Sequence, residues 1–262
     1  MNRFLGKTCA LGLALVAGLL VLAPVGFAQD TNWKGFYAGG NVGGAFGSSD
    51  AQTSTIYSAT GYFATTSVPA IATTGAQHLT PRGVSGGGQA GYNFQSGHFV
   101  LGAEADFGAM NLSNSVSGTA VYPCCAPTAF TVTQSVNTSW LFTARPRVGY
   151  ASGRALVYGT AGLAMTNLNY QATFTDTYAT AAESGGVNKT QTGWAAGGGV
   201  EYRVGSHWSL TGEYLYANFG SVSATSTNLT AYTPAQSYPT NIFTHSANLH
   251  SHIARFGVNY RF

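Results

Sequence analysis

Hydrophobic and polar residues alternate along three similar segments of the chain, at residues 86–107, 142–165 and 194–216. Alternation with a period of two places successive side chains on opposite faces of a β-strand. A short turn rich in glycine and serine interrupts each segment near its middle, around Gly97 in the first of them. Two alternating runs joined by a tight turn indicate a β-hairpin, so the sequence predicts three hairpins of one design.

Single alternating runs at 35–47 and 252–262 lie before and after the hairpins, which brings the expected number of strands to eight. Four long stretches rich in serine, threonine, alanine and asparagine separate these units, at 48–82, 110–137, 167–190 and 220–247. Short turns that alternate with long loops are typical of an all-β fold, an eight-stranded antiparallel up-and-down transmembrane β-barrel. We expect the four long loops to be extracellular and both termini to be periplasmic. Whether 51–82 forms a further hairpin stays open at this point.

The charged residues of the predicted strands fall on one face, opposite large apolar residues. In one strand, for example, Glu104 and Asp106 alternate with Leu101 and Phe107. An arginine that faces lipid at the membrane midplane costs about 2–4 kcal/mol, so we expect the charged face to point into the barrel. The predicted lumen charge network consists of Glu104, Asp106, Arg145, Arg147, Glu201, Arg203, Glu213, Arg255 and Arg261. Because eight strands enclose a space just wide enough for side chains, we expect these ion pairs to fill the lumen.

A soluble, lipocalin-like barrel or sandwich is the alternative, since it would show the same alternation with its apolar face turned inward. Two features of the sequence count against it. The long loops occur at one end only, and the chain ends on the apolar and aromatic run Val258, Tyr260 and Phe262.

The first 28 residues have the pattern of a secretory signal peptide. Arg3 and Lys7 precede an apolar run over 11–22, and small residues precede the expected cleavage site. We therefore expect residues 1–28 to be removed on export and residues 29–262 to form the barrel.

Composition narrows the classes of partner and the redox compartment. Charged residues make up 7% of the chain and the formal net charge is +3, so there is no basis for a nucleic-acid partner. Export implies an oxidising compartment, in which thiols tend to pair. The adjacent Cys124 and Cys125 leave three interpretations open: a vicinal disulfide, a metal site, or a loop tip whose cysteines have no special role.

We expect the tryptophans to lie in or near the interfacial aromatic belts of the membrane, at Trp33, Trp140, Trp194 and Trp208.

Several segments together resemble one known family. They are WKGFYAGGNVGGAFG at 33–47, GGGQAGYNFQSGHFVLGAEADFG at 86–108, TGWAAGGGVEYRVGSHWSLTGEYLYANFG at 192–220 and RFGVNYRF at 255–262. They are similar to the opacity-protein-like outer-membrane β-barrel family, in its alphaproteobacterial major surface protein branch (RopB type). The resemblance implies a cell outer membrane location in a Gram-negative envelope, with outer-membrane lipid and lipopolysaccharide as surroundings. It also implies assembly by periplasmic chaperones and the barrel-assembly machinery, with Val258, Tyr260 and Phe262 as the assembly signal.

Three sets of residues could carry chemistry. Residues 86–91, GGGQAG, formally match a dinucleotide-binding motif, but that motif needs a following helix and here a strand pattern continues. The run His250-Ser251-His252 contains the serine and histidine that an enzyme acting on lipids could use, but no acidic partner lies nearby in sequence. His245, His250 and His252 form the most concentrated histidine cluster, a candidate metal or haem site in which His250 and His252 share one strand face.

The sequence therefore predicts an integral outer-membrane surface protein with a structural role in envelope integrity and with exposed loops for external interactions. The alternative function is a small porin-like channel or a haem- or metal-capture surface receptor. We expect no enzyme activity, no cofactor and a monomer, and the sequence names no loop ligand.

Overall fold

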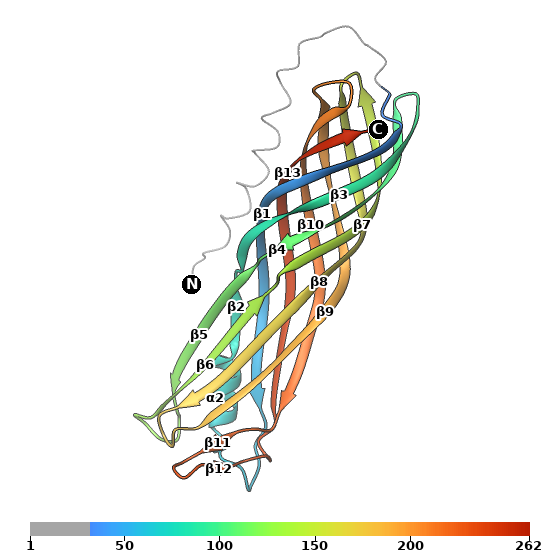
Figure 1. Ribbon diagram of the computed structural model, residues 1–262. Helices are drawn as coiled ribbons and strands as arrows, with labels where there is room; N and C mark the ends of the chain where they lie inside the picture. Colours follow the sequence, from blue (N-terminus) through green and yellow to red (C-terminus); the bar gives the residue numbers. More distant parts are fainter. Residues whose placement is uncertain (1–31) are drawn as a thin grey trace, which may run out of the picture.

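The alternating segments form one antiparallel, 13-stranded sheet that curves around a common axis in the computed structural model, which describes residues 32–262 (Figure 1). The strands are β1 (Gly35–Thr55), β2 (Ala76–Leu79), β3 (Arg82–Ser96), β4 (Phe99–Met110), β5 (Ser113–Val121), β6 (Ala129–Asn137), β7 (Trp140–Ser152), β8 (Ala155–Asp176), β9 (Ala182–Arg203), β10 (Trp208–Ser226), β11 (Thr230–Ala231), β12 (Gln236–Ser237) and β13 (Phe243–Arg261). The helix α2 (Ser67–Thr74) lies between β1 and β2 in the chain. The expected signal peptide, 1–28, lies outside the described residues.

Eight of the strands pair in a closed cycle, in the order β1–β3–β4–β7–β8–β9–β10–β13 and back to β1. Every pair in the cycle is antiparallel. The closing pair joins the first strand to the last, with Tyr37 opposite Arg261 and Thr55 opposite Phe243. In this cycle each strand has a partner on both sides, so no edge is left open.

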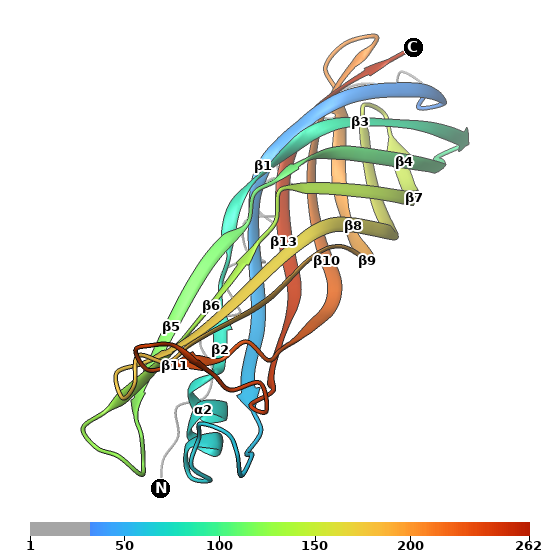
Figure 2. The same cartoon turned by 60° about the horizontal axis from the view of Figure 1, so that its bottom comes forward.

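The wall of the molecule continues beyond this cycle with different strands. β8 pairs with β7 over Ala155–Thr166 and then with β6 over Asn169–Asp176. Similarly, β1 pairs with β3 and then with the short strand β2. The two edges of this extension of the wall are β2 and β5, and α2 lies beside them, in the lower part of Figures 1 and 2. A side-chain amide connects the two edges. Gln134 Nε2, on β6 beside β5, donates at 2.8 Å to the carbonyl of Gly75, which lies between α2 and β2.

The short turns and the end of β13 lie at the opposite end of the molecule from α2 (Figure 1). Gly97 and Gly153 occupy the left-handed region, at φ +59° and +54°. Residues with a side chain rarely adopt this conformation, which explains why the tight hairpin turns contain glycine.

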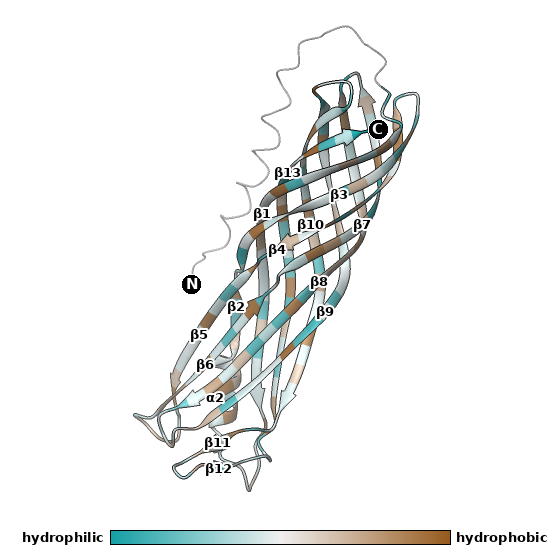
Figure 3. Cartoon of the chain, in the orientation of Figure 1, coloured by the Kyte–Doolittle hydropathy of each residue, from teal (hydrophilic) through white to brown (hydrophobic). Residues whose placement is uncertain are grey.

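The interior changes character along the axis, as the inward-facing residues of β13 show. From the short-turn end these are first polar (Arg261, Asn259, Arg255), then apolar apart from Ser251 (Ile253, Leu249, Ala247), and then His245 and Phe243. The apolar residues belong to a buried middle cluster, which includes Leu141, Ala164, Leu168, Leu215 and Phe219. A second cluster lies near the far end, which we call the tip cluster, and its members include Phe63, Ile71, Phe130, Phe174 and Phe243. Within the individual strands, hydrophobic and hydrophilic residues alternate (Figure 3).

The all-β expectation is confirmed, but the described chain has 13 strands and not eight. The additional strands come from the stretches expected to be loops, and the cycle strands β1, β8, β9, β10 and β13 also extend into them. Residues 51–82 form the end of β1, then α2, then β2, which pairs back onto β1. Within residues 32–262, no helix has the length and hydropathy needed to cross a membrane.

Candidate functional site

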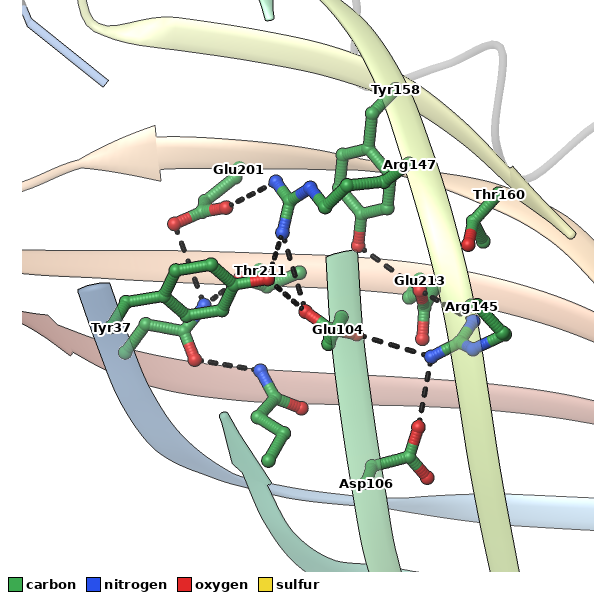
Figure 4. A network of polar contacts seen from close by, with 12 residues as sticks. Tyr37, Glu104, Asp106, Arg145, Arg147, Tyr158, Thr160, Glu201, Thr211 and Glu213 are labelled. Carbon is green, nitrogen blue, oxygen red and sulfur yellow. Dashed lines mark hydrogen bonds and ion pairs between the residues drawn. The ribbon is translucent and has the colours of Figure 1, made fainter. Parts of the chain in front are cut away.

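Eight of the nine charged residues predicted to line the lumen are buried inside the strand cycle, and Figure 4 shows Glu104, Asp106, Arg145, Arg147, Glu201 and Glu213. Alternation along β4 turns Glu104 and Asp106 inward, and alternation along the neighbouring β7 turns Arg145 and Arg147 inward. Glu104 and Arg145 are also direct partners in the β4–β7 register. The two strands thus supply two carboxylates and two guanidinium groups at one level of the interior.

Arg145 lies at the centre of this group. Its guanidinium contacts three carboxylates: Nη2 lies 3.1 Å from Glu104 Oε1 and 2.9 Å from Asp106 Oδ2, and Nη1 lies 3.1 Å from Glu213 Oε1. Its remaining donor, Nε, donates to Thr143 Oγ1 at 2.8 Å. Each of its three nitrogens therefore donates to at least one side chain, and the acceptors come from three strands.

Arg255, from β13, closes the other side of the same group. Nη1 and Nη2 donate to the two carboxylate oxygens of Asp106, each at 3.0 Å. Nε donates to Glu213 Oε2 at 2.7 Å. Two arginines and two acids therefore alternate around a ring of ion pairs, in which Glu213 and Asp106 each bridge Arg145 and Arg255.

Arg147 connects this ring to a second level nearer the short turns. Its Nη1 lies 3.2 Å from Glu104 Oε2 and its Nη2 lies 2.8 Å from Glu201 Oε2. The guanidinium carbon lies 4.1 Å from the ring centroid of Tyr158. Tyr37 OH donates to Glu104 Oε2 at 2.7 Å, so the tyrosine completes the coordination of that carboxylate.

The network is neutral as a whole. It contains four carboxylates and four guanidinium groups, those of Glu104, Asp106, Glu201, Glu213, Arg145, Arg147, Arg255 and Arg261. All eight side chains are buried. Buried charges are tolerated in proteins when they are paired and hydrogen-bonded, which is the state of these groups.

Arg261 and Arg203 lie at the margin of the network. Arg261 Nη2 is 3.5 Å from Glu201 Oε1, and its Nη1 donates to the carbonyl of Trp33. Arg203 makes no ion pair among the described residues and instead donates to the carbonyls of Asn32 and Ser206. Arg203 therefore differs from the other eight residues of the predicted set, because it is only partly buried and donates to backbone carbonyls instead of carboxylates.

Sequence reasoning missed the uncharged members of this site. Tyr37 and Tyr158 contact its acids directly, and Thr143 and Ser209 donate to Asp106 and Glu201. For Thr143 and Ser209 the same alternation could have given the signal, because they share the inward parity of Arg145 and Glu213 on their strands. Tyr37 and Tyr158 have no charged strand neighbour at this level that would have marked them. Space for Tyr37 comes from Gly91, where a Cβ atom would lie 2.4 Å from the tyrosine oxygen.

The three candidate histidines do not come together. His245 is buried inside, with Nε2 3.1 Å from Glu183 Oε1 and Nδ1 3.0 Å from Thr53 Oγ1. His250 and His252 lie on the outward face of β13, where their Nδ1 atoms bond to the hydroxyls of tyrosines on β10. His250 and His252 lie five and seven positions after His245 on the same strand, and these odd offsets turn His245 to the opposite face. Among residues 32–262, no three His, Cys, Asp or Glu side chains are placed to hold a metal ion.

The candidate assembly residues Val258, Tyr260 and Phe262 lie on the outward face at the end of the chain. The ring of Tyr260 packs edge-on against those of Trp208 and Phe262, with centroids 5.1 and 5.2 Å apart. This aromatic group forms one sector of the outer surface at the short-turn end.

One of the four tryptophans is not where the sequence placed it. Trp140, Trp194 and Trp208 have outward-facing rings, but Trp33 is fully buried inside the mouth of the cycle. Its ring lies 4.9 Å from the guanidinium carbon of Arg261 and 5.7 Å from that of Arg203. The expected belt position of Trp33 is therefore wrong, and the physical reason is that these two cations draw its ring inward.

A separate polar cluster lies at the far end of the molecule. The hydroxyls of Tyr62 and Tyr122 both donate to Asp176 Oδ2, at 2.6 and 3.0 Å. Burial, together with the adjacent carboxylate, raises the pKa of both tyrosine hydroxyls well above the usual value. The cluster joins the β1–α2 connection to the β5–β6 hairpin and the end of β8.

Comparison with known proteins identifies the family to which this architecture belongs. The family model for the outer membrane protein beta-barrel domain matches residues 12–262, nearly the whole chain. The chain belongs to this outer-membrane β-barrel family. The 31 kDa outer-membrane immunogenic protein of Brucella melitensis biotype 1 is 31% identical over 256 residues, which cover 92% of this chain and 88% of that protein. The 22 kDa outer membrane protein of Rhizobium leguminosarum bv. viciae is 31% identical over 137 residues, 52% of this chain and 53% of that protein.

Among solved structures, the crystal structure of Ail, the attachment invasion locus protein of Yersinia pestis, covers 88% of this chain and 100% of its own, with a TM-score of 0.34 and 13% identity. The sequence relatives confirm the expected alphaproteobacterial outer-membrane branch. This β-barrel family member is thus an outer-membrane protein.

Proposed function

We propose that the eight-strand cycle spans the outer membrane as a closed barrel with a filled interior, and that the protein has a structural role in envelope integrity while presenting its long loops outside the cell. The observation that carries this proposal is the neutral, buried ion-pair network enclosed by a strand cycle whose outer face is apolar.

The outer face of the cycle supports a membrane position. Large apolar side chains are exposed there, with Phe36 66%, Phe107 62% and Phe256 76% exposed. Soluble monomers rarely expose a continuous apolar surface of this kind, whereas lipid solvates it well. In the proposed arrangement the apolar face of each strand meets lipid and the charged face meets the interior.

The outward residues also define where the apolar band ends. Along β8 the outward series runs from Val157 through Leu163 and Met165 and then changes to Asn167 and Gln171. The same change occurs on other strands that extend past the cycle, where the outward residues are mostly serine, threonine and asparagine. Uncharged polar side chains suit water, so we place this extension, with α2 and the β5–β6 hairpin, outside the cell.

The interior argues against a conduit. An eight-stranded cycle leaves room only for side chains, and here the ion pairs fill one level. The middle cluster fills the next level with packed apolar side chains such as Leu215 and Ile253. A solute would have to displace both layers.

The same contacts argue against catalysis by the paired acids. Glu104 and Asp106 are each held by two arginines, and both are buried in the sealed interior. A general acid or base needs contact with a substrate, and these carboxylates have none available. A structural role for the pair fits the geometry better than an enzymatic one.

The partners that fit this arrangement are outer-membrane lipid and lipopolysaccharide around the apolar band. During assembly, periplasmic chaperones and the barrel-assembly machinery would meet the exposed terminal residues Val258, Tyr260 and Phe262. Because every strand of the cycle is paired on both sides, we propose that the protein functions as a monomer. An external ligand would bind at the loops.

Planar-bilayer conductance of the refolded protein tests the filled interior. A gel shift between unheated and boiled samples verifies that the barrel has folded, and a porin of about 16 strands serves as the conducting control. We expect a folded barrel without current steps. Discrete steps from a folded sample would overturn the proposal in favour of the small porin-like channel.

The envelope role needs a test in cells. We expect deletion of the gene to increase the sensitivity of the bacteria to detergent, and the wild-type gene to restore resistance. Unchanged sensitivity in the deletion strain would contradict a structural role and direct attention to the loops alone.

A further inference from the structure

The tip of the β5–β6 hairpin carries a disulfide between adjacent residues, Cys124 and Cys125. The hairpin tip lies at the end of the molecule farthest from the short turns (Figure 1). Cys124 is exposed, and its sulfur lies 3.9 Å from the hydroxyl of Ser67. Cys125 is partly buried and packs against the tip cluster. The two sulfurs thus have different surroundings.

This disulfide has no evident structural role. A disulfide stabilises a fold mainly by restricting a long loop of the unfolded chain, and a bridge between neighbours closes no such loop. Neighbouring Cα atoms are 3.8 Å apart, below the range of about 4.4–6.8 Å in which most disulfides occur. Bridges outside that range are more easily reduced.

The hairpin tip is held in place without the bond. The backbone amide of Tyr122 donates to the carbonyl of Thr128 at 2.9 Å, and the amide of Thr128 donates to the carbonyl of Cys125 at 3.0 Å. The Tyr122 hydroxyl is anchored on Asp176. Opening the disulfide would therefore leave the hairpin and the barrel intact.

We propose that Cys124–Cys125 is a thiol–disulfide exchange site that takes up small thiols of the glutathione class. The thiolate of the incoming small molecule attacks the exposed Cys124 sulfur and forms a new S–S bond with it. The Cys124–Cys125 bond breaks, and its electron pair leaves on the Cys125 sulfur, which takes up the proton lost by the incoming thiol. The two oxidising equivalents pass from the vicinal bond to the mixed disulfide, so no other oxidant is needed.

Mass spectrometry and alkylation of the purified, folded protein test the chemistry. Before treatment we expect no thiol that reacts with a maleimide. After treatment with reduced glutathione we expect one glutathione on Cys124 and one alkylatable thiol on Cys125, located by peptide mapping. Two reactive thiols in the untreated protein, or no adduct after treatment, would overturn the proposal.

Single variants test which sulfur is accessible. Cys125→Ser leaves Cys124 as the free thiol, and Cys124→Ser leaves Cys125. We expect alkylation of Cys124 to be at least about tenfold faster, because reactivity follows exposure and Cys125 packs against apolar side chains. Equal rates would contradict attack at Cys124. The double variant Cys124→Ser/Cys125→Ser is the control, which should keep the gel shift of a folded barrel and form no adduct.

The chemistry does not depend on the proposed function, but its location outside the cell does. Intact cells treated with glutathione and then with a membrane-impermeant maleimide should be labelled on Cys125. Labelling that requires disruption of the outer membrane would overturn the external location, while adduct formation on the purified protein would still support the exchange site.

Discussion

Arg255 donates to both carboxylate oxygens of Asp106, at 3.0 Å each, although 149 positions separate the two residues in the chain. Their strands, β13 and β4, are not neighbours in the strand cycle. The contact therefore crosses the interior and fixes two separate parts of the wall relative to each other. A pair of this kind can form only when the two halves of the chain have come together.

Asp106→Asn should destabilise the barrel by about 3–5 kcal/mol, because it removes the carboxylate that Arg255 and Arg145 share and leaves the buried network with an uncompensated positive charge. Denaturant unfolding in lipid vesicles, followed by tryptophan fluorescence, measures the loss. The double variant Asp106→Asn/Arg255→Gln should cost less than the sum of the two single variants, since each single change removes the same contact. Strict additivity would show that the two residues do not interact in the folded protein.

Arg145 and Arg203 offer a matched comparison of two arginines in the same barrel. Arg145→Gln leaves three buried carboxylates short of a partner, so we expect a loss of unfolding free energy of about 3–5 kcal/mol. Arg203→Gln removes an arginine at the margin of the network that has no carboxylate contact, and we expect a loss of about 1 kcal/mol. The same unfolding measurement ranks them, and equal losses would contradict the assignment of Arg203 to the margin.

Gly91 should not tolerate a side chain. A Cβ atom there would lie 2.4 Å from the Tyr37 hydroxyl and 2.6 Å from the carbonyl of Ala103. Because the second contact is backbone, rotation of Tyr37 does not relieve it, and Gly91→Val should reduce the yield of heat-modifiable, folded barrel. Gly97→Val is a less crowded comparison, since no atom lies within 4 Å of its Cβ position, although its positive φ adds strain.

Trp33→Ala tests whether the ring at the mouth of the cycle is needed to close the interior. The buried ring fills the mouth, so its loss should cost about 3–5 kcal/mol of stability. The ion-pair network behind it remains, and we therefore expect no current steps in a planar bilayer. Conductance in this variant alone would identify Trp33 as the closing element.

The strand alternation explains how much of this architecture could be predicted. Inward parity alone grouped Glu104, Asp106, Arg145 and Arg147, because a strand fixes the face of every second residue. The same rule could have identified β6, whose residues Phe130–Val136 alternate apolar or amide side chains with threonine and serine. Its serine- and threonine-rich composition is also typical of a loop, which masks the alternation.

Other features depend on contacts that no local pattern contains. The inward position of Trp33 depends on Arg203 and Arg261, which are distant in the chain. The exchange of β7 for β6 as the partner of β8 depends on where the β5–β6 hairpin leaves the wall. Similarly, His245 on β13 contacts Glu183 on β9 only when both strands pair with β10, which lies between them.

The tyrosine pair at Asp176 predicts a response to alkaline pH. The pKa of Tyr62 and of Tyr122 is raised by burial and by the carboxylate, above the value of about 10 of an unfolded chain. Their contribution to stability is therefore fully present below pH of about 10 and is lost as the pH rises above it. We expect the loops that meet at Asp176 to become sensitive to protease in that range, while the barrel keeps its gel shift.

Phenolate absorbance during an alkaline titration measures this directly. In Asp176→Asn the two hydroxyls lose the adjacent negative charge, so the part of the titration that occurs at the highest pH should move toward lower pH. Tyr62→Phe/Tyr122→Phe is the control, which should remove that late part altogether. Identical titration curves for the wild type and for Asp176→Asn would show that the carboxylate does not hold these tyrosines in their neutral form.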